Sequence, residues 1–194
     1  MTPRSKNQTT ERKRQPPHPF HEYVGRELTW SQPRAMKREF VLRAGRTDVA
    51  HLRWVKVLGS LAEGRAGDQR WTFKRCGFLK PYVSIRETGA KADAARIELG
   101  WWGNGTLHFP DGRTLQWARS SFWSWTCDWS FSTSDGRRVV QFTPKLTMWR
   151  RVAIARIYDQ GEHTGEAPLL ILLGWYLIVT MVDECQAATG IACT

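Results

Sequence analysis

The feature that most constrains this chain is an apolar run near its end, APLLILLGWYLIVTMV from Ala167 to Val182, without one charged side chain. A helix that is apolar on every side must be surrounded by its own protein or by lipid. At 1.5 Å per residue the run spans roughly 24 Å, which is shorter than the hydrocarbon layer of a bilayer at about 30 Å. We therefore predict a central helix over residues 166–184, enclosed by protein, whose core residues are Leu169, Leu172, Leu173, Trp175, Tyr176, Ile178 and Val179.

The alternative is that the same helix anchors the chain in a membrane. A tail anchor of this length requires Asp183 and Glu184, which end the apolar run, to lie on the translocated side. The flanks of the run carry no Lys or Arg, the residues that usually anchor a membrane helix on its cytoplasmic side. The enclosed helix is the interpretation we favour, and the membrane span stays open.

Short strand patterns fill the chain before this helix. Apolar and polar residues alternate between turn-forming residues, which is typical of antiparallel strands with one buried face. Asp111-Gly112 and Asp135-Gly136 mark two hairpin turns, because glycine supplies the positive φ that such turns need. We predict a mainly β fold in which about twelve antiparallel strands form a barrel around the helix, over residues 28–34, 38–43, 49–54, 60–65, 70–75, 82–86, 94–99, 106–109, 114–118, 123–133, 137–142 and 149–158.

The positive charge lies in the body of the chain. The net charge is +11, and the chain after Arg156 holds five acidic and no basic residues, so the first 156 residues carry +16. Such a body attracts anionic membranes, nucleic acids or acidic protein surfaces. Residues 1–26 contain Arg12-Lys13-Arg14 and several prolines but no apolar periodicity. They are predicted to form a flexible basic tail, which leaves residues 27–190 as one domain.

Eleven tryptophans are an unusual enrichment. Tryptophan favours strands and brings a large apolar area, and most of these residues fall in alternating patterns, so we expect most of the rings to face the core. Rings exposed beside Lys or Arg would instead offer stacking platforms for bases. Nucleic-acid binding is therefore the alternative to lipid binding.

Motifs for catalysis are missing from the sequence. There is no phosphate-binding loop, dinucleotide-binding glycine pattern or nucleophile elbow, and neither the histidines nor the cysteines have metal-ligand spacing. The N-terminus also lacks the apolar region of a signal peptide. We expect a non-enzymatic, monomeric, cytoplasmic protein with reduced thiols and without a metal or cofactor.

Basic residues beside predicted turns are the strongest functional signal. One cluster flanks Phe78 and Leu79, which could enter a membrane interface while the cations contact head groups. The others follow a hairpin or open the last predicted strand. The candidate ligands for phosphate or lipid head groups are Lys74, Arg75, Lys80, Arg137, Arg138, Arg150 and Arg151.

Three segments resemble the tubby-like barrel superfamily: RWTFKRCGFLKPYVSIRE, GTLHFPDGRTLQW and the terminal LLILLGWYLIVTMV. This superfamily includes tubby domains, plant LURP-one-related proteins and phospholipid scramblases, and the chain looks most like small bacterial members over roughly residues 28–188. The resemblance implies a closed barrel threaded by its terminal helix. It also implies binding of phosphoinositides or other anionic phospholipids, or a scaffold role, at the membrane surface. The acidic calcium-loop pattern proposed for scramblases is not found.

Overall fold

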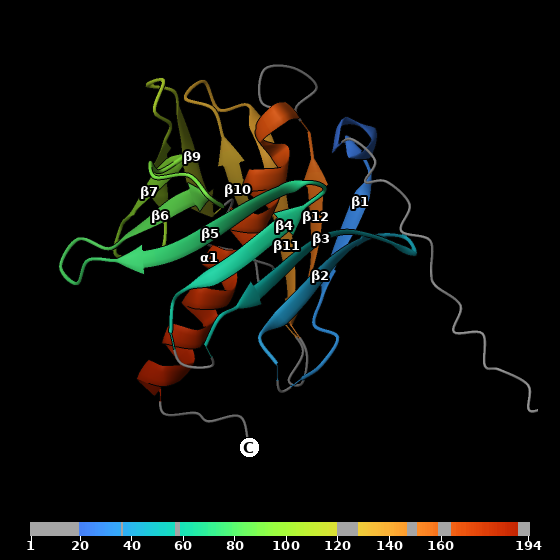
Figure 1. Ribbon diagram of the computed structural model, residues 1–194, viewed down its shortest axis with the longest axis horizontal. Coiled ribbons are helices and arrows are strands. Elements are labelled where there is room, and N and C mark those ends of the chain that lie inside the picture. The colour runs from blue at the N-terminus through green and yellow to red at the C-terminus, as the bar shows by residue number, and fades with distance from the viewer. Residues whose placement is uncertain are drawn as a thin grey trace, which may run out of the picture.

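In the part of the chain that the structure describes, twelve strands form a closed antiparallel barrel around one long helix (Figure 1). The computed structural model describes residues 20–35, 37–56, 59–119, 128–146, 151–158 and 164–189. Neighbouring strands in the sequence pair with one another, and β1 pairs with β12 to close the barrel, so the predicted fold class is confirmed. The strands are β1 Glu27–Ser31, β2 Glu39–Ala44, β3 Thr47–Trp54, β4 Ala62–Ala66, β5 Gln69–Cys76, β6 Tyr82–Glu87, β7 Ala95–Leu99, β8 Gly105–His108, β9 Thr114–Arg119, β10 Trp129–Ser132, β11 Arg138–Leu146 and β12 Arg151–Ile157.

All twelve predicted strands occur in the predicted order, and two of them differ clearly in length. The strand predicted over residues 123–133 is described only as β10: residues 120–127 lie outside the described part of the chain, and Asp128 and Thr133 are not in a strand. β11 runs past its predicted end at Phe142 and includes Pro144. Proline lacks an N–H group and is normally confined to strand edges. Pro144 lies beyond the last described pair between β10 and β11, Trp129 with Phe142, and there it pairs with Ala153 of β12.

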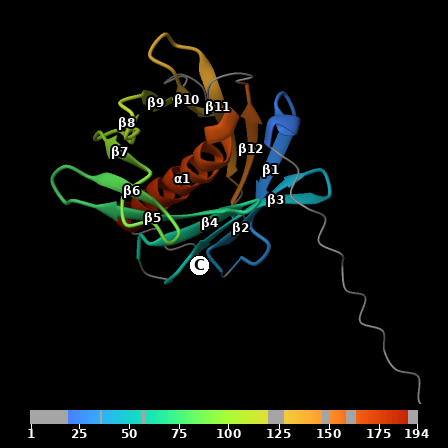
Figure 2. The same cartoon turned by 45° about the horizontal axis from the view of Figure 1, so that its top comes forward.

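The helix α1, Ala167–Thr189, crosses the barrel with strands on all sides (Figure 2). A single 3-10 turn, η2 Thr164–Glu166, leads into it. Its length and composition would also let residues 167–187 cross a membrane, but most of this segment is buried inside the barrel. The predicted enclosure of the helix is therefore confirmed, and its predicted core residues are all buried: Leu169, Leu172, Leu173, Trp175, Tyr176, Ile178 and Val179.

Close packing between helix and barrel depends on small residues and stacked rings. A Cβ atom placed on Gly174 would lie 2.3 Å from the ring of Phe142, so only glycine lets α1 approach β11 this closely. On β12, Ala153 and Ala155 are fully buried and are also small. The ring of Trp175 stacks on that of Trp30 in β1, with centroids 5.9 Å apart. These contacts fix the rotation of the helix inside the barrel.

The helix ends at Thr189, five residues beyond the predicted boundary at residue 184. The prediction was wrong because Asp183 and Glu184 end the apolar run without ending the helix. Both carboxylates pair with arginines of the barrel, which removes the cost of their charge at the helix C-terminus.

The predicted tail, residues 1–26, is too long at its C-terminal end. A 3-10 turn, η1 Phe20–Tyr23, packs on the barrel with both aromatic rings buried. The N–H of Gly25 then donates a hydrogen bond of 2.9 Å to the carbonyl of Ile157. Residues 20–26 belong to the folded body because these rings bury apolar area against it. The rest of the predicted tail, residues 1–19, lies outside the described residues.

The barrel has two rims, and α1 contacts both of them. At the N-terminal rim, where α1 begins, Glu166 pairs with Arg113 of the β8–β9 turn at 2.5 Å. At the C-terminal rim, where α1 ends, the helix meets the β1–β2, β3–β4 and β7–β8 loops and the end of β5. Because all strand pairs are antiparallel, the hairpin loops alternate between the two rims.

Candidate functional site

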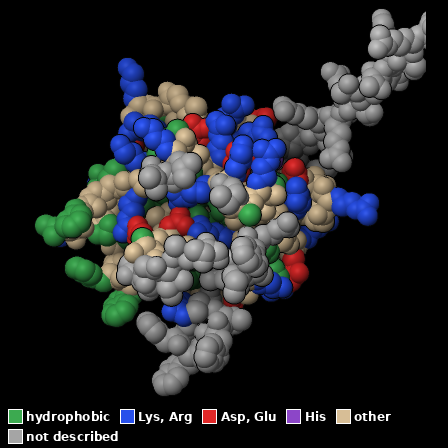
Figure 3. Space-filling model, turned by 90° about the horizontal axis from the view of Figure 1, so that it is seen from below, with side chains coloured by type: hydrophobic (Ala, Val, Ile, Leu, Met, Phe, Trp, Pro, Cys, Tyr) green, Lys and Arg blue, Asp and Glu red, His purple; other side chains and the backbone are tan. Residues whose placement is uncertain are grey.

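Two neighbouring hairpin loops at the C-terminal rim expose four large apolar side chains. Phe78 and Leu79 of the β5–β6 loop are 98% and 82% exposed, and Trp101 and Trp102 of the β7–β8 loop are 96% and 81% exposed. We call these four residues the rim patch. Figure 3 shows hydrophobic side chains that project from one side of this rim. A cluster of this size on a soluble protein normally marks a binding surface.

Glycines at fixed positions shape the two loops. Gly77 has φ +78°, and a Cβ atom there would lie 2.4 Å from the carbonyl oxygen of Lys80. Gly103 has φ +80° and packs against Met181 of α1, whose sulfur would lie 2.9 Å from an added Cβ. Residues other than glycine are strained at such φ values. The tight loops therefore leave the large side chains beside these glycines outside the barrel.

A cavity of about 450 Å³ lies between the two loops. Its cationic lining comes from Arg75, Lys80 and Arg96, and apolar side chains of the rim patch form part of its edge. The Arg96 guanidinium lies over the ring of Tyr82, 3.8 Å from its centroid, and also 3.6 Å from a carboxylate oxygen of Glu98. The cavity thus combines apolar edges with basic side chains.

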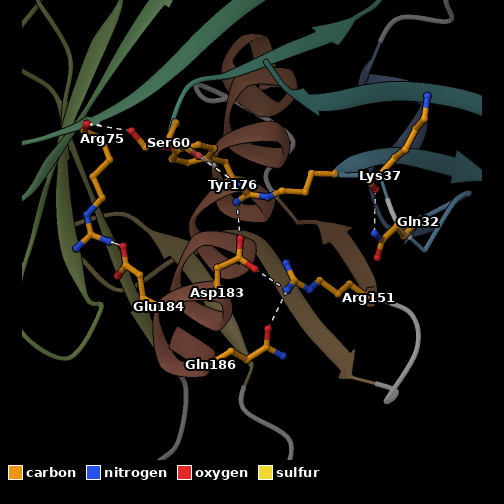
Figure 4. Close-up of polar contacts among 11 residues, drawn as sticks. Gln32, Lys37, Ser60, Arg75, Arg151, Tyr176, Asp183, Glu184 and Gln186 are labelled. Atoms are coloured by element: carbon orange, nitrogen blue, oxygen red, sulfur yellow. Dashed lines mark hydrogen bonds and ion pairs between the residues drawn. The ribbon is translucent and has the colours of Figure 1, made fainter. Parts of the chain in front are cut away.

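Beside this cavity, ion pairs tie the last turns of α1 to the rim (Figure 4). Arg75 pairs with Glu184, and Arg151 pairs with Asp183 at 2.5 Å and donates to Gln186 at 3.2 Å. Arg38 pairs with the second oxygen of Asp183. Burial lowers the pKa of Arg38 from its usual value, and the Asp183 carboxylate opposes that shift. These arginines therefore hold the helix in place.

Tyr176 forms the inner boundary of this network. Its hydroxyl donates a hydrogen bond of 2.6 Å to the carbonyl oxygen of Ser60 in the β3–β4 loop (Figure 4). Burial raises the pKa of Tyr176 to about 12, because the ionised phenolate would lose its hydration inside the barrel.

The structure brings part of the predicted basic set together at the C-terminal rim. Lys74 and Lys80 have no ion pair within the described part of the chain, so both charges face solvent near the rim patch. Arg75 and Arg151 lie at the same rim, but their side chains turn toward α1. Arg150 lies outside the described residues.

The remaining predicted pair lies at the opposite rim. Arg137 ends the β10–β11 turn and Arg138 begins β11, away from the rim patch. Arg137 is 2.8 Å from Asp135, and Arg138 donates to Gln141 at 2.7 Å. Arg137 and Arg138 therefore interact with residues close to them in sequence. They do not form one site with the other predicted basic residues.

The sequence analysis missed the tryptophans of the rim patch. The described tryptophans in strands and in the helix are buried, as expected: Trp30, Trp54, Trp71, Trp117, Trp129 and Trp175. Trp101 and Trp102 are adjacent and flanked by Gly100 and Gly103. Neighbouring residues of a strand point to opposite faces, so two adjacent tryptophans cannot both face a core from one strand. That spacing was the available signal for their exposure.

The site offers apolar surface beside cationic side chains. Within the described ranges, no group of three or more His, Cys, Asp and Glu residues could hold a metal ion. The candidate residues are the rim patch, the cavity-lining Arg75, Lys80 and Arg96, and the nearby Lys74. No family model, no curated protein and no solved structure matches this chain.

Proposed function

We propose that this protein is a non-enzymatic barrel that binds membranes containing anionic phospholipids through its C-terminal rim. The observation that carries the proposal is the exposure of Phe78, Leu79, Trp101 and Trp102 on two adjacent loops. Amphipathic aromatic rings prefer the boundary between water and lipid. The loops would enter the outer part of the bilayer while the barrel stays in water.

The energies of the individual contacts favour this arrangement. Complete burial of a large apolar side chain contributes about 1.5–3 kcal/mol, so even partial insertion of four such side chains offsets several kcal/mol of lost motional freedom. Each cation close to an anionic leaflet adds about 1 kcal/mol. Lys74 and Lys80 are placed to supply this attraction, since neither has an ion pair among the described residues.

The fold is consistent with the same proposal. The twelve-strand barrel around a terminal helix is the architecture that the resemblance to tubby-like barrels implies. That resemblance also implies anionic phospholipids as ligands at a membrane surface. A cytoplasmic monomer that binds the membrane peripherally is part of the same proposal. The charge of +16 on the first 156 residues supports attraction to such a surface.

Co-sedimentation with vesicles tests the proposal. The intact protein should bind phosphatidylcholine vesicles that contain phosphatidylserine, bind pure phosphatidylcholine vesicles more weakly, and dissociate as salt is raised. The double variant Phe78→Ser, Trp101→Ser should bind about tenfold more weakly or worse, because each 1.4 kcal/mol corresponds to a factor of ten. Both residues are exposed, so its melting temperature should not change.

Control variants at the opposite rim distinguish binding through the C-terminal rim from nonspecific binding to vesicles. Lys80→Ala should weaken binding, whereas Lys91→Ala, which removes the same charge from the β6–β7 loop at the opposite rim, should not. Tyr158→Ser alters an exposed ring at that opposite rim and should also leave binding unchanged. The proposed orientation would be refuted if Lys80→Ala and Lys91→Ala lost vesicle affinity equally. It would also be refuted if substitutions in the rim patch left vesicle binding unchanged.

Single-stranded nucleic acid is the second candidate ligand, and the exposure of Trp101 and Trp102 is the observation that favours it. Bases stack on aromatic rings, whereas an aliphatic side chain such as Leu79 offers no stacking surface. A nucleic-acid binder should therefore lose affinity in Trp101→Ser, Trp102→Ser and keep it in Leu79→Ser. A lipid binder should lose vesicle affinity in both variants.

A further inference from the structure

Two arginines face each other on the outer surface of the barrel, away from the rim patch. Arg65 of β4 and Arg70 of β5 are directly paired in the antiparallel register. Their Cβ atoms are therefore about 5 Å apart, and like charges at this spacing destabilise a sheet. Arg65 is half-buried, which reduces the screening of the repulsion by water.

The neighbouring arginines on this surface are neutralised by acids. Arg43 pairs with Asp48 at 2.7 Å, Arg53 with Glu63 at 2.7 Å, and Arg86 with Asp93 at 2.9 Å. Within the described part of the chain, Arg65 and Arg70 have no such partner. Asp68, the acid of the β4–β5 turn, pairs with neither of them. An uncompensated pair among compensated arginines indicates a place for an anion from outside the chain.

Arg65 and Arg70 both line an open cavity of about 650 Å³ on this surface. Its size suits a small organic ligand. His51, Thr72 and Thr88 also line it and add polar groups. Glu39, Arg53 and Glu63 line it as well, and Arg53 already occupies the Glu63 carboxylate through two hydrogen bonds. The forked donors of paired arginines match the oxygens of a phosphate group.

The cavity extends to Pro33 in the β1–β2 loop, but Arg65 and Arg70 lie at its other end, too far from the rim patch to share one lipid head group with it. Arg70 lies five residues before Arg75 on β5, and at about 3.3 Å per residue the separation along the strand is roughly 17 Å. A head group at the level of the rim patch would not reach Arg70. We propose that Arg65 and Arg70 form a binding site for a soluble phosphomonoester, distinct from the membrane-binding rim.

Calorimetric titration with glucose 6-phosphate, and with glucose as the uncharged probe, tests this site. The intact protein should bind the phosphate ester and not the sugar. Arg65→Gln and Arg70→Gln should each weaken binding about tenfold or more. Arg43→Gln, which removes an equal charge from a neutralised position on the same surface, should bind like the unaltered chain. In the absence of ligand, Arg65→Gln should also unfold at higher urea concentration than the unaltered chain, because the repulsion is relieved.

The outcomes separate this site from the proposed membrane function. The variant Phe78→Ser, Trp101→Ser should keep full affinity for glucose 6-phosphate, and Arg65→Gln should keep full affinity for phosphatidylserine vesicles. If the unaltered chain does not bind the phosphate ester, or if Arg43→Gln loses as much affinity as Arg65→Gln, the proposal is overturned. Loss of vesicle binding in Arg65→Gln without any binding of glucose 6-phosphate would also overturn it and assign the cavity to a lipid head group.

Discussion

Tyr176 links the stability of the core to pH. Its pKa is raised to about 12 in the folded protein, whereas an unfolded tyrosine ionises near pH 10. Between these values the unfolded chain holds fewer protons, so folding stability is intact below pH 10 and is lost as the pH rises toward 12. The shift corresponds to a loss of about 2–3 kcal/mol. Urea unfolding at pH 7, 9 and 11 should show this alkaline decline.

The variant Tyr176→Phe isolates that contribution. At pH 7 it should cost about 1 kcal/mol, because the hydrogen bond to the carbonyl of Ser60 is lost. Between pH 10 and 12 its stability should fall less steeply than that of the unaltered chain, since Phe has no proton to lose. An equally steep decline in the variant would assign the pH dependence to other groups.

At the scale of single residues, burial was more predictable than exposure. Alternation within strands and the unbroken apolar run placed residues such as Trp30 and Trp175 in the core, and both are fully buried. Tyr176 was predicted as a core residue, but its bond to Ser60 joins parts of the chain 116 residues apart and has no local signature. The pairing of Arg75 with Glu184 also has no local signature in the sequence. It directs the Arg75 side chain, which was predicted to bind phosphate or lipid head groups, toward α1.

Among the elements, the last turns of α1 depend on the acids that close the C-terminal rim. Asp183 lies between Arg38 and Arg151, and all three side chains are mostly shielded from water. Asp183→Asn leaves two guanidinium groups without their shared carboxylate, so it should cost about 1–3 kcal/mol in urea unfolding. Asp135→Asn, in an exposed turn with the partner Arg137, should change stability by less than about 0.5 kcal/mol.

Element boundaries were harder to predict than element order. Every predicted strand exists because a two-residue period is a local property of the sequence. The end of α1 depends instead on distant arginines, and the extension of β11 past Phe142 depends on its pairing with β12. One part of the rim patch could be predicted from local sequence, and the other part depends on the fold. Phe78 and Leu79 were placed beside a turn by sequence, but only the fold brings Trp101 to the same cavity.

The folded barrel depends on α1, because the helix packs against the apolar inner faces of the strands. Deletion of residues 166–194 removes α1 and exposes the apolar inner faces of the strands, including Phe73 and Phe142. The shortened chain should aggregate, whereas the intact chain should stay soluble without detergent. Fractionation of expressed protein into soluble and pelleted material measures this. A soluble, cooperatively folded remainder would show that the barrel stands without the helix.

The seam between β1 and β12 has a consequence for synthesis in the cell. The ribosome delivers β1 first, and it delivers the partner strand and the internal plug last. Until then, the incomplete sheet has two unpaired edge strands and an exposed apolar face. Both features promote aggregation. The barrel therefore cannot close until β12 and α1 have both been synthesised, and the strands made earlier stay open to aggregation until that point.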